Sequence, residues 1–346
     1  QRQMCIRDRD EAQYIKNQST KNAQTVKLIN GKYRFALTGT PIENSLAELW
    51  SIFDFLMPQY LFNYHYFQKQ YENDIVKNND EEKTKQLKKL VTPFILRRNK
   101  KEVLTELPDK IEQNIILPFN DEEEKLYVAN LAEVNKELQE LYDLEGSDKM
   151  QILKLLTRLR QLCLEPRLVY DNIDQPSSKL KACMELIKTM QENKQKVLLF
   201  SSFTSVLDLI AEECQKAGIT YYMLTGSTNK EDRRELVSRF QKDDTTVFLI
   251  SLKAGGTGLN LTSAEAVIHF DPWWNVSAQN QATDRAYRIG QKNNVQVFNL
   301  VMKDSVEEKI IELQKRKKEL ADMFVENNSG GLSQMSKEDI LSLFTM

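Results

Sequence analysis

Residues 246–270, TVFLISLKAGGTGLNLTSAEAVIHF, combine two apolar, β-branched runs with a glycine-rich segment between them. The runs TVFLIS and AVIHF carry few polar side chains, which is typical of strands buried on both faces of a parallel sheet. Gly255, Gly256 and Gly258 stand where the chain must leave the first strand. Because ligands of parallel sheets bind at the carboxyl ends of strands, this stretch indicates both a fold class and a candidate site.

The same kind of pattern continues over residues 176–325. Further apolar runs at 196–202, 220–224 and 295–301 alternate with amphipathic helical patterns. Strict alternation of strand and helix predicts an α/β fold, with helices covering both faces of a parallel sheet.

Two stretches of different character precede this unit. Residues 10–57 contain a short strand signal, YRFALTGT, and then an apolar pattern at helical spacing, which together indicate the tail end of another α/β unit. The apolar positions of that pattern are Leu46, Leu49, Trp50, Phe53 and Leu56. Residues 58–175 are almost entirely helical in pattern, with one extended interruption at 107–118, which favours a helical insertion or brace.

Composition excludes several classes of protein. The 346 residues include 48 Lys plus Arg and 50 Asp plus Glu, a net charge of −2, and no run of 18 apolar residues that would predict a membrane span. Four scattered cysteines and two histidines support neither a disulfide framework nor a zinc site. Charge is segregated locally, since residues 83–101 hold eight basic side chains and no acid. That run suits a solvated helix face and a nucleic-acid contact about equally.

The glycine-rich segment is a weak signal when it stands alone. Glycine permits positive φ and lets backbone N–H groups approach an anion. The segment does not match G-x-x-x-x-G-K-[ST], and Leu261 replaces the third glycine of a dinucleotide fingerprint. A plain tight turn is the alternative.

Residues 270–291, FDPWWNVSAQNQATDRAYRIGQ, contain Arg285 and Arg288, three positions apart on an expected helix. That spacing would project both side chains from one face, where they could stabilise charge on a transferring phosphoryl group. Ordinary salt bridges are the alternative. Trp273 and Trp274 suit loop packing, or else contact with a nucleotide or base.

Two shorter motifs lie near the beginning of the sequence. DEAQ at 10–13 offers adjacent carboxylates, the chemistry that holds Mg²⁺ and orients an attacking water. LTGTP at 37–41 presents two hydroxyls on a turn that follows a strand signal. Each motif has little specificity in isolation.

In this order and spacing, the motifs closely resemble those of Swi/Snf-type ATPases, DNA-translocating members of helicase superfamily two. The resemblance extends from residue 10 over nearly the whole sequence and includes TPFILRRNKKEVLTELPDK, KVLLFSSF and the closing KEDILSLF. It implies two RecA-like lobes of the P-loop NTPase type that clamp ATP and Mg²⁺ and move along double-stranded DNA.

The resemblance also implies roles for particular residues. It makes Asp10 the Mg²⁺-associated acid, Glu11 the residue that activates water, and Arg285 with Arg288 the catalytic arginines of the second lobe. It assigns nucleotide binding to Gly256, Gly258 and Gln281. It assigns DNA binding or coupling to Thr38, Thr40, Ser251, Lys253, Thr257, Lys100 and Lys101.

The sequence departs from the family pattern at its beginning. The G-x-G-K-[ST]-type phosphate loop is missing, so we expect a first lobe truncated to residues 10–57 and no ATP hydrolysis by this chain alone. Residues 1–9 are polar where the family has an apolar strand, and we expect them to be foreign to the protein. The remaining expected parts are a helical protrusion and brace at 58–175, a second RecA-like lobe at 176–325 and a tail at 326–346.

The leading hypothesis is therefore the C-terminal part of a duplex-DNA translocase or remodeler. The alternatives are a strand-separating helicase of the same superfamily and a non-catalytic DNA-binding or regulatory module. Expected partners are double-stranded DNA and a DNA-bound protein or RNA polymerase, with no membrane and a monomeric state. The expected location is the bacterial cytoplasm at the nucleoid, or the nucleus of a eukaryote.

Overall fold

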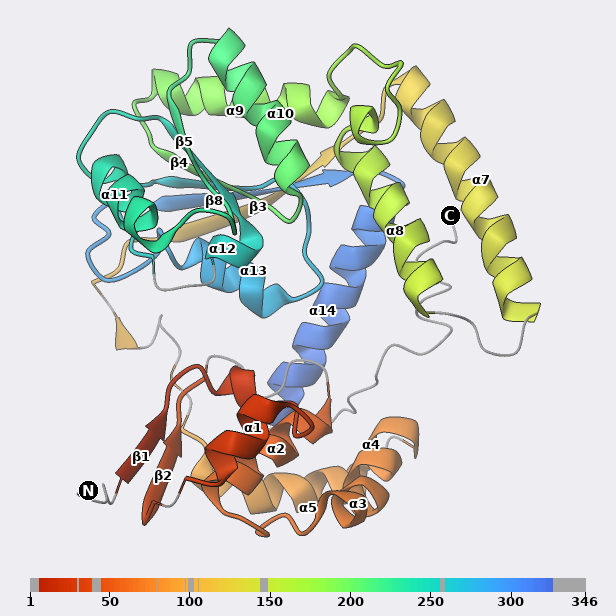
Figure 1. Cartoon of the computed structure of the whole chain (residues 1–346), viewed down its shortest axis with the longest axis vertical. Coiled ribbons are helices and arrows are strands. Elements are labelled where there is room, and N and C mark those ends of the chain that lie inside the picture. Colours follow the sequence, from red (N-terminus) through yellow and green to blue (C-terminus); the bar gives the residue numbers. More distant parts are fainter. Residues whose placement is uncertain are drawn as a thin grey trace. The chain divides into compact units, whose positions relative to one another are not determined.

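The computed structural model describes residues 6–29, 31–38, 45–78, 80–96, 98, 103–104, 106–143, 149–255 and 259–325 (Figure 1). The chain divides into two compact units, with one boundary after residue 99 and a second inside the last helix, after residue 312. No described helix is long and apolar enough to cross a membrane.

The first unit contains a two-stranded parallel sheet and a set of short helices. Strand β1 (Ile6–Arg9) pairs with β2 (Tyr33–Ala36), and Asp10 follows β1 directly. The origin of residues 1–9 stays a prediction, but residues 6–9 form the strand that precedes DEAQ. The helical elements are η1 (Ala12–Ile15), α1 (Lys21–Lys27), α2 (Leu46–Leu56), α3 (Tyr64–Phe67), the π-helical η2 (Gln68–Glu72), α4 (Asn73–Asn78), α5 (Glu81–Val91) and η3 (Thr92–Phe94).

The predicted helical spacing near residue 50 is confirmed by α2. Leu46, Leu49 and Phe53 lie on its buried face and pack with Phe67 and Leu87 from the helices that follow. Apolar side chains at i, i+3 and i+7 form one stripe on a helix, so a single face can supply this core.

The second unit is built on a six-stranded parallel sheet, which confirms the predicted fold class (Figure 1). Its strand order is β3-β8-β7-β4-β6-β5. The strands are β3 (Lys110–Leu117), β4 (Val197–Ser201), β5 (Tyr221–Leu224), β6 (Val247–Ser251), β7 (Ala266–His269) and β8 (Val295–Met302). The helices are α7 (Asp121–Asp143), α8 (Lys149–Leu164), η4 (Pro166–Leu168), α9 (Ser178–Glu192), α10 (Thr204–Lys216), α11 (Lys230–Phe240), α12 (Leu252–Gly255), α13 (Val276–Thr283) and the part of α14 (Val306–Val325) up to residue 312.

The expected helical segment 58–175 is divided by the structure. Its extended interruption forms β3, which pairs with β8 over eight residues, and the contacts place residues 100–175 in the second unit. The alternating pattern of this edge strand is weak, and its partner strand lies about 185 residues later in the sequence. The local sequence therefore does not mark β3 as part of a sheet.

Side chains of the central strands alternate between two cores. In β4, Val197 and Leu199 face the core shared with α9 and α10, whereas Leu198 and Phe200 face the core shared with the 282–287 segment. Successive side chains of a strand point to opposite faces, so a fully apolar strand fills both cores at once. This burial holds the carboxyl ends of β4, β6 and β7 in place.

Candidate functional site

In the first unit, the acidic motif lies in a strained turn directly after β1. Asp10 and Glu11 are both exposed. Glu11 has φ 53° and ψ 50°, and its N–H donates to Asp10 Oδ1 at 2.8 Å. A non-glycine residue in the left-handed region costs free energy, and such residues cluster at functional sites.

Gln13 connects the acidic motif to the hydroxyl motif. Its side-chain amide nitrogen donates to Glu11 Oε2, and its amide oxygen accepts the Thr38 hydroxyl at 3.0 Å. The backbone supports this link, since Ala12 N–H donates to the Leu37 carbonyl at 2.9 Å. The acidic motif therefore lies next to Leu37 and Thr38, and Gln13 links the two, a connection that the sequence reasoning missed although it quoted DEAQ.

Asp10 and Glu11 match what Mg²⁺ requires of a protein in an ATPase. The described residues contain no group of three acidic, histidine or cysteine side chains that would enclose a metal. Mg²⁺ commonly takes one or two carboxylates and fills its other positions with phosphate oxygens and water. Two exposed carboxylates, those of Asp10 and Glu11, fit that donor set.

In the second unit, Gly255 is the last residue of α12 and packs tightly against side chains of β4 and β6. A Cβ at this position would lie 2.9 Å from Phe200 Cε1 and 3.3 Å from Ile250 Cγ2. The expected reason for glycine, a positive φ, is wrong for Gly255, because close approach to the phenylalanine ring is what excludes a side chain. Gly256, Thr257 and Gly258 lie outside the described residues.

Arg285 joins the arginine motif to the glycine segment on both of its sides. Its Nε donates to the Gly255 carbonyl at 3.0 Å, and its own carbonyl accepts the N–H of Leu261 at 3.0 Å. Only 9% of Arg285 is exposed. Two motifs about 30 residues apart in the sequence therefore form one structural feature.

Arg288 differs from Arg285 in its surroundings, because its side chain is exposed. The prediction that both arginines project from one helix face is wrong. Helix α13 ends at Thr283, and a tight turn follows in which Arg288 N–H donates to the Ala286 carbonyl at 3.1 Å. Gln291 holds this turn, since its Nε2 donates to the carbonyls of Ala264 and Ala286 at 2.8 and 3.2 Å.

The other predicted site residues differ in exposure, and some of them lie outside the described residues. Ser251 is buried at the end of β6, Lys253 is exposed on α12, and Gln281 is half-buried on α13. Thr40, Lys100 and Lys101 lie outside the described residues. Ser251 and Lys253 are close to Gly255 in the sequence, and the roles predicted for all of these residues stay predictions.

Buried polar side chains hold α13 at its middle and at its C-terminal end. Gln279 Nε2 donates to Asn299 Oδ1 at 3.0 Å, and His269 Nε2 lies 2.9 Å from the Thr283 hydroxyl. Burial lowers the pKa of His269 to about 4, because the charged imidazolium is poorly solvated there. The ring is therefore neutral near pH 7. Sequence reasoning missed these residues because each one sits within a strand or helix pattern.

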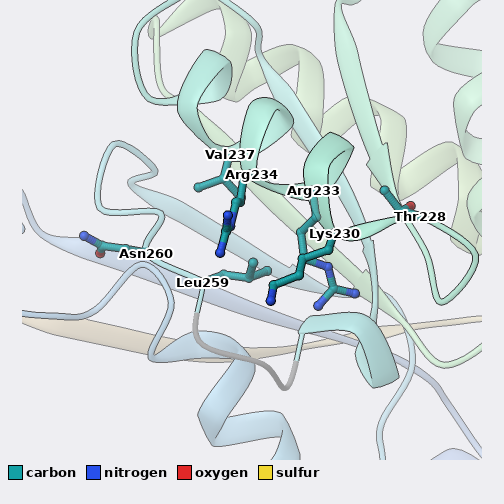
Figure 2. A pocket seen from close by; sticks show the side chains of 7 residues that line it. All are labelled: Thr228, Lys230, Arg233, Arg234, Val237, Leu259 and Asn260. Atoms are coloured by element: carbon teal, nitrogen blue, oxygen red, sulfur yellow. The ribbon is translucent and has the colours of Figure 1, made fainter.

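A basic cavity of about 620 Å³ opens between α11 and the segment after the glycines (Figure 2). Lys230, Arg233, Arg234 and Val237 follow the i, i+3, i+4, i+7 pattern and extend from one face of α11 toward Leu259 (Figure 2). The residues that line the cavity are Thr228, Lys230, Arg233, Arg234, Val237, Leu259 and Asn260. Three cations therefore line one cavity together with Leu259 and Asn260.

These features define the class of protein: the second unit is a RecA-like lobe of a helicase-type ATPase, with its motifs at the carboxyl ends of the strands. Residues 3–168 match the SNF2-related domain, and residues 178–290 match the helicase conserved C-terminal domain. The Sulfolobus solfataricus SWI2/SNF2 ATPase core in complex with dsDNA is 36% identical, with a TM-score of 0.54, over 94% of this chain and 69% of that one. The chain belongs to the SWI2/SNF2 family of ATPases.

Longer relatives occur in bacteria and in yeast. An ATP-dependent helicase of Mycoplasma pneumoniae is 39% identical over 97% of this chain and 32% of its own length. The ISWI chromatin-remodeling complex ATPase ISW1 of Saccharomyces cerevisiae is 33% identical over 96% of this chain and 31% of its own length. The chain therefore spans about a third of the length of these relatives.

Proposed function

We propose that this chain is the C-terminal part of an ATP-dependent translocase that moves along double-stranded DNA. The observation that carries the proposal is the contact of Arg285 with Gly255, which joins the arginine motif to the glycine segment at the carboxyl ends of the strands. The family and the adjacent acidic and hydroxyl motifs of the first unit support the same conclusion.

In this proposal, the residues of each unit have distinct tasks in ATP hydrolysis. Mg²⁺, when bound at Asp10, supplies charge neutralisation for the phosphate oxygens. Glu11 orients the attacking water and accepts its proton, with its carboxylate held by the Gln13 amide. Arg288 stabilises the charge that develops on the phosphoryl group, while Arg285 holds the turn that presents Arg288.

The cavity below α11 supports a role in binding the DNA backbone. Its three cations lie on one helix face, whereas Glu231, Asp232 and Glu235 occupy other faces of the same helix. Lysine and arginine bind phosphate without reading the base sequence, so contacts of this kind suit a protein that moves along duplex DNA.

We expect the chain to bind duplex DNA weakly, without sequence preference, and with strong salt dependence. Replacing Lys230, Arg233 and Arg234 together by Gln removes up to three phosphate contacts, which should lower the slope of log K against log salt by about 2–3. Fluorescence anisotropy of a labelled duplex between 50 and 200 mM salt, about the range over which such contacts respond, measures the slope.

A matched control removes the same charge from the other face of the sheet. Lys181, Lys188 and Lys216 are exposed on α9 and α10, and their triple Gln variant should keep the wild-type slope. Equal slopes for the two triple variants, or strong selection of one DNA sequence, would contradict phosphate binding by α11.

The proposed activity predicts two results for phosphate release. The chain alone should show no detectable turnover of ATP with or without duplex, because its sequence contains no G-x-x-x-x-G-K-[ST] loop to hold the phosphates. A protein that joins these residues to an upstream phosphate-binding loop should hydrolyse ATP, and duplex DNA should accelerate it. Absence of DNA stimulation in the joined protein would refute the proposed function.

A further inference from the structure

Arg160 is a buried arginine on α8, in the segment expected to be a brace, and 6% of it is exposed. Its Nη2 lies 2.9 Å from Asp271 Oδ2, and it also donates to the Ser202 hydroxyl at 3.1 Å and the Pro272 carbonyl at 3.3 Å. One guanidinium nitrogen of a helix outside the recognised motifs therefore contacts the first residues of the arginine motif.

Three aromatic rings surround the same guanidinium. The distances from Arg160 Cζ to the ring centroids are 5.0 Å for Phe203, 5.6 Å for Trp273 and 5.8 Å for Trp274. The Nε of Arg160 is buried, and no hydrogen-bond partner for it occurs among the described residues. Apolar side chains in place of both Arg160 and Asp271 would avoid that cost, and buried ion pairs seldom raise stability above such a double replacement. The directional bonds of Arg160 therefore point to a role other than stability.

Asp271 connects the carboxyl ends of two central strands, β4 and β7. It is 1% exposed and follows β7 closely, and its Oδ1 accepts the Ser201 hydroxyl at 2.7 Å and the Ser202 N–H at 3.0 Å, where β4 ends. Arg160 is the cation paired with this carboxylate. The pair thus joins α8 to the carboxyl ends of the strands, where ligands of parallel sheets bind.

The chain after Asp271 leads directly to the arginines. Asn275 caps α13 by accepting the N–H of Ala278 at 3.1 Å, and Trp273 N–H donates to Gln279 Oε1 at 3.2 Å. Helix α13 then runs to Thr283, immediately before the turn that carries Arg285. We expect a displacement of residues 271–275 to shift α13 and the turn after it, because these hydrogen bonds hold the start of the helix.

We propose that Arg160 is a positioning residue for Arg285 and Arg288, acting through Asp271 and the start of α13. The inference rests on the proposed function, in which Arg288 acts on ATP and Arg285 holds the turn that presents Arg288. It makes α8 part of the ATPase mechanism and not only a support for the fold.

The test compares four variants in a protein that joins these residues to an upstream phosphate-binding loop. Arg160→Met keeps an unbranched, flexible side chain that can pack against the aromatic rings. Arg160→Lys keeps the charge without the planar fork, and Arg160→Met/Asp271→Asn removes both charges. Arg158→Met is the matched control, since Arg158 lies on α8 in a partly exposed pair with Glu133 at 3.2 Å.

We expect kcat for DNA-stimulated hydrolysis to fall about tenfold to a hundredfold in all three Arg160 variants, because small misplacements of catalytic groups carry costs of that size. The KM for ATP should change less than about threefold, as expected when transition-state contacts are lost. Arg160→Met should lower the Tm, and the double variant should recover it because no unpaired carboxylate remains. The double variant should not recover kcat.

Recovery of kcat together with Tm in the double variant, or wild-type kcat in Arg160→Lys, would overturn the positioning role. Hydrogen exchange of α13 in the present chain gives a readout independent of hydrolysis, and Arg160→Met should exchange at least about tenfold faster than Arg158→Met. Equal exchange would also overturn the proposal. A wild-type protein that is not stimulated by DNA would instead refute the proposed function, while the exchange measurement would still decide the role of Arg160.

Discussion

Arg288→Ala is expected to reduce DNA-stimulated ATP hydrolysis by about 10³- to 10⁵-fold, the range typical of an arginine finger. The residue is exposed on the turn after α13, so its loss should change the free energy of unfolding by no more than about 0.5 kcal/mol. Because the guanidinium acts on charge that develops in the transition state, ATP binding should be largely retained. Steady-state phosphate release at saturating duplex, in a protein that supplies the phosphate-binding loop, measures the effect.

The control for this variant is Lys292→Ala, which removes an exposed cation four residues later. Its kcat should stay within about threefold of the wild type, since a surface charge outside the reacting centre contributes little. If Arg288→Ala kept substantial turnover, the assignment of the finger to this residue would be wrong, and Arg285→Ala would be the next variant to measure.

Lys179→Met is expected to destabilise the second unit by about 3–5 kcal/mol, because it leaves a buried carboxylate without its cation. Lys179 Nζ lies 2.6 Å from both carboxylate oxygens of Glu307, and the two side chains are 0% and 1% exposed. Glu307 Oε2 also accepts the N–H of Met302 at 2.8 Å, so the pair joins α9 to the start of α14. Thermal unfolding should show a Tm lower by about 6–20 °C for a unit of this size.

The same variant should be sensitive to pH in a defined direction. Burial raises the pKa of Glu307 above its usual value of 4.5, so the folded state holds this proton more readily than the unfolded state. Stability attributable to Glu307 therefore falls as pH rises from 4.5 through the raised pKa, and the loss of Lys179 widens that window. The Lys179→Met variant should regain part of its lost stability as the pH falls from 8 to 5.

Two further variants serve as controls for the Lys179→Met experiment. Lys181→Met changes an exposed lysine on the same helix and should shift the unfolding free energy by no more than about 0.5 kcal/mol. Lys179→Met/Glu307→Gln should recover most of the loss, because neither partner then carries a buried charge. A stability deficit that is independent of pH and persists in the double variant would show that packing, and not the ion pair, is responsible.

The fold of the second unit was predictable because its central strands are apolar on both faces. Local patterns record that burial directly, and β4 to β8 all lie within two residues of the predicted runs. The edge strand β3 was predicted only as an extended interruption, since its half-exposed side chains carry little apolar pattern and its partner β8 is remote. A pairing between distant strands leaves no trace in either local sequence.

For the candidate site, the sequence identifies the residues, whereas the tertiary structure places them. The order of motifs in the amino-acid sequence was sufficient to assign the family and to nominate Asp10, Glu11, Arg285 and Arg288, because phosphoryl transfer requires carboxylates and guanidinium groups. The contacts of Arg285 with Gly255 and of Arg160 with Asp271, and the exposure of Arg288, depend on where α13 ends and on which segments pack against it. Such contacts join residues 30 to 111 positions apart, and chain folding alone brings these polar atoms within hydrogen-bond distance.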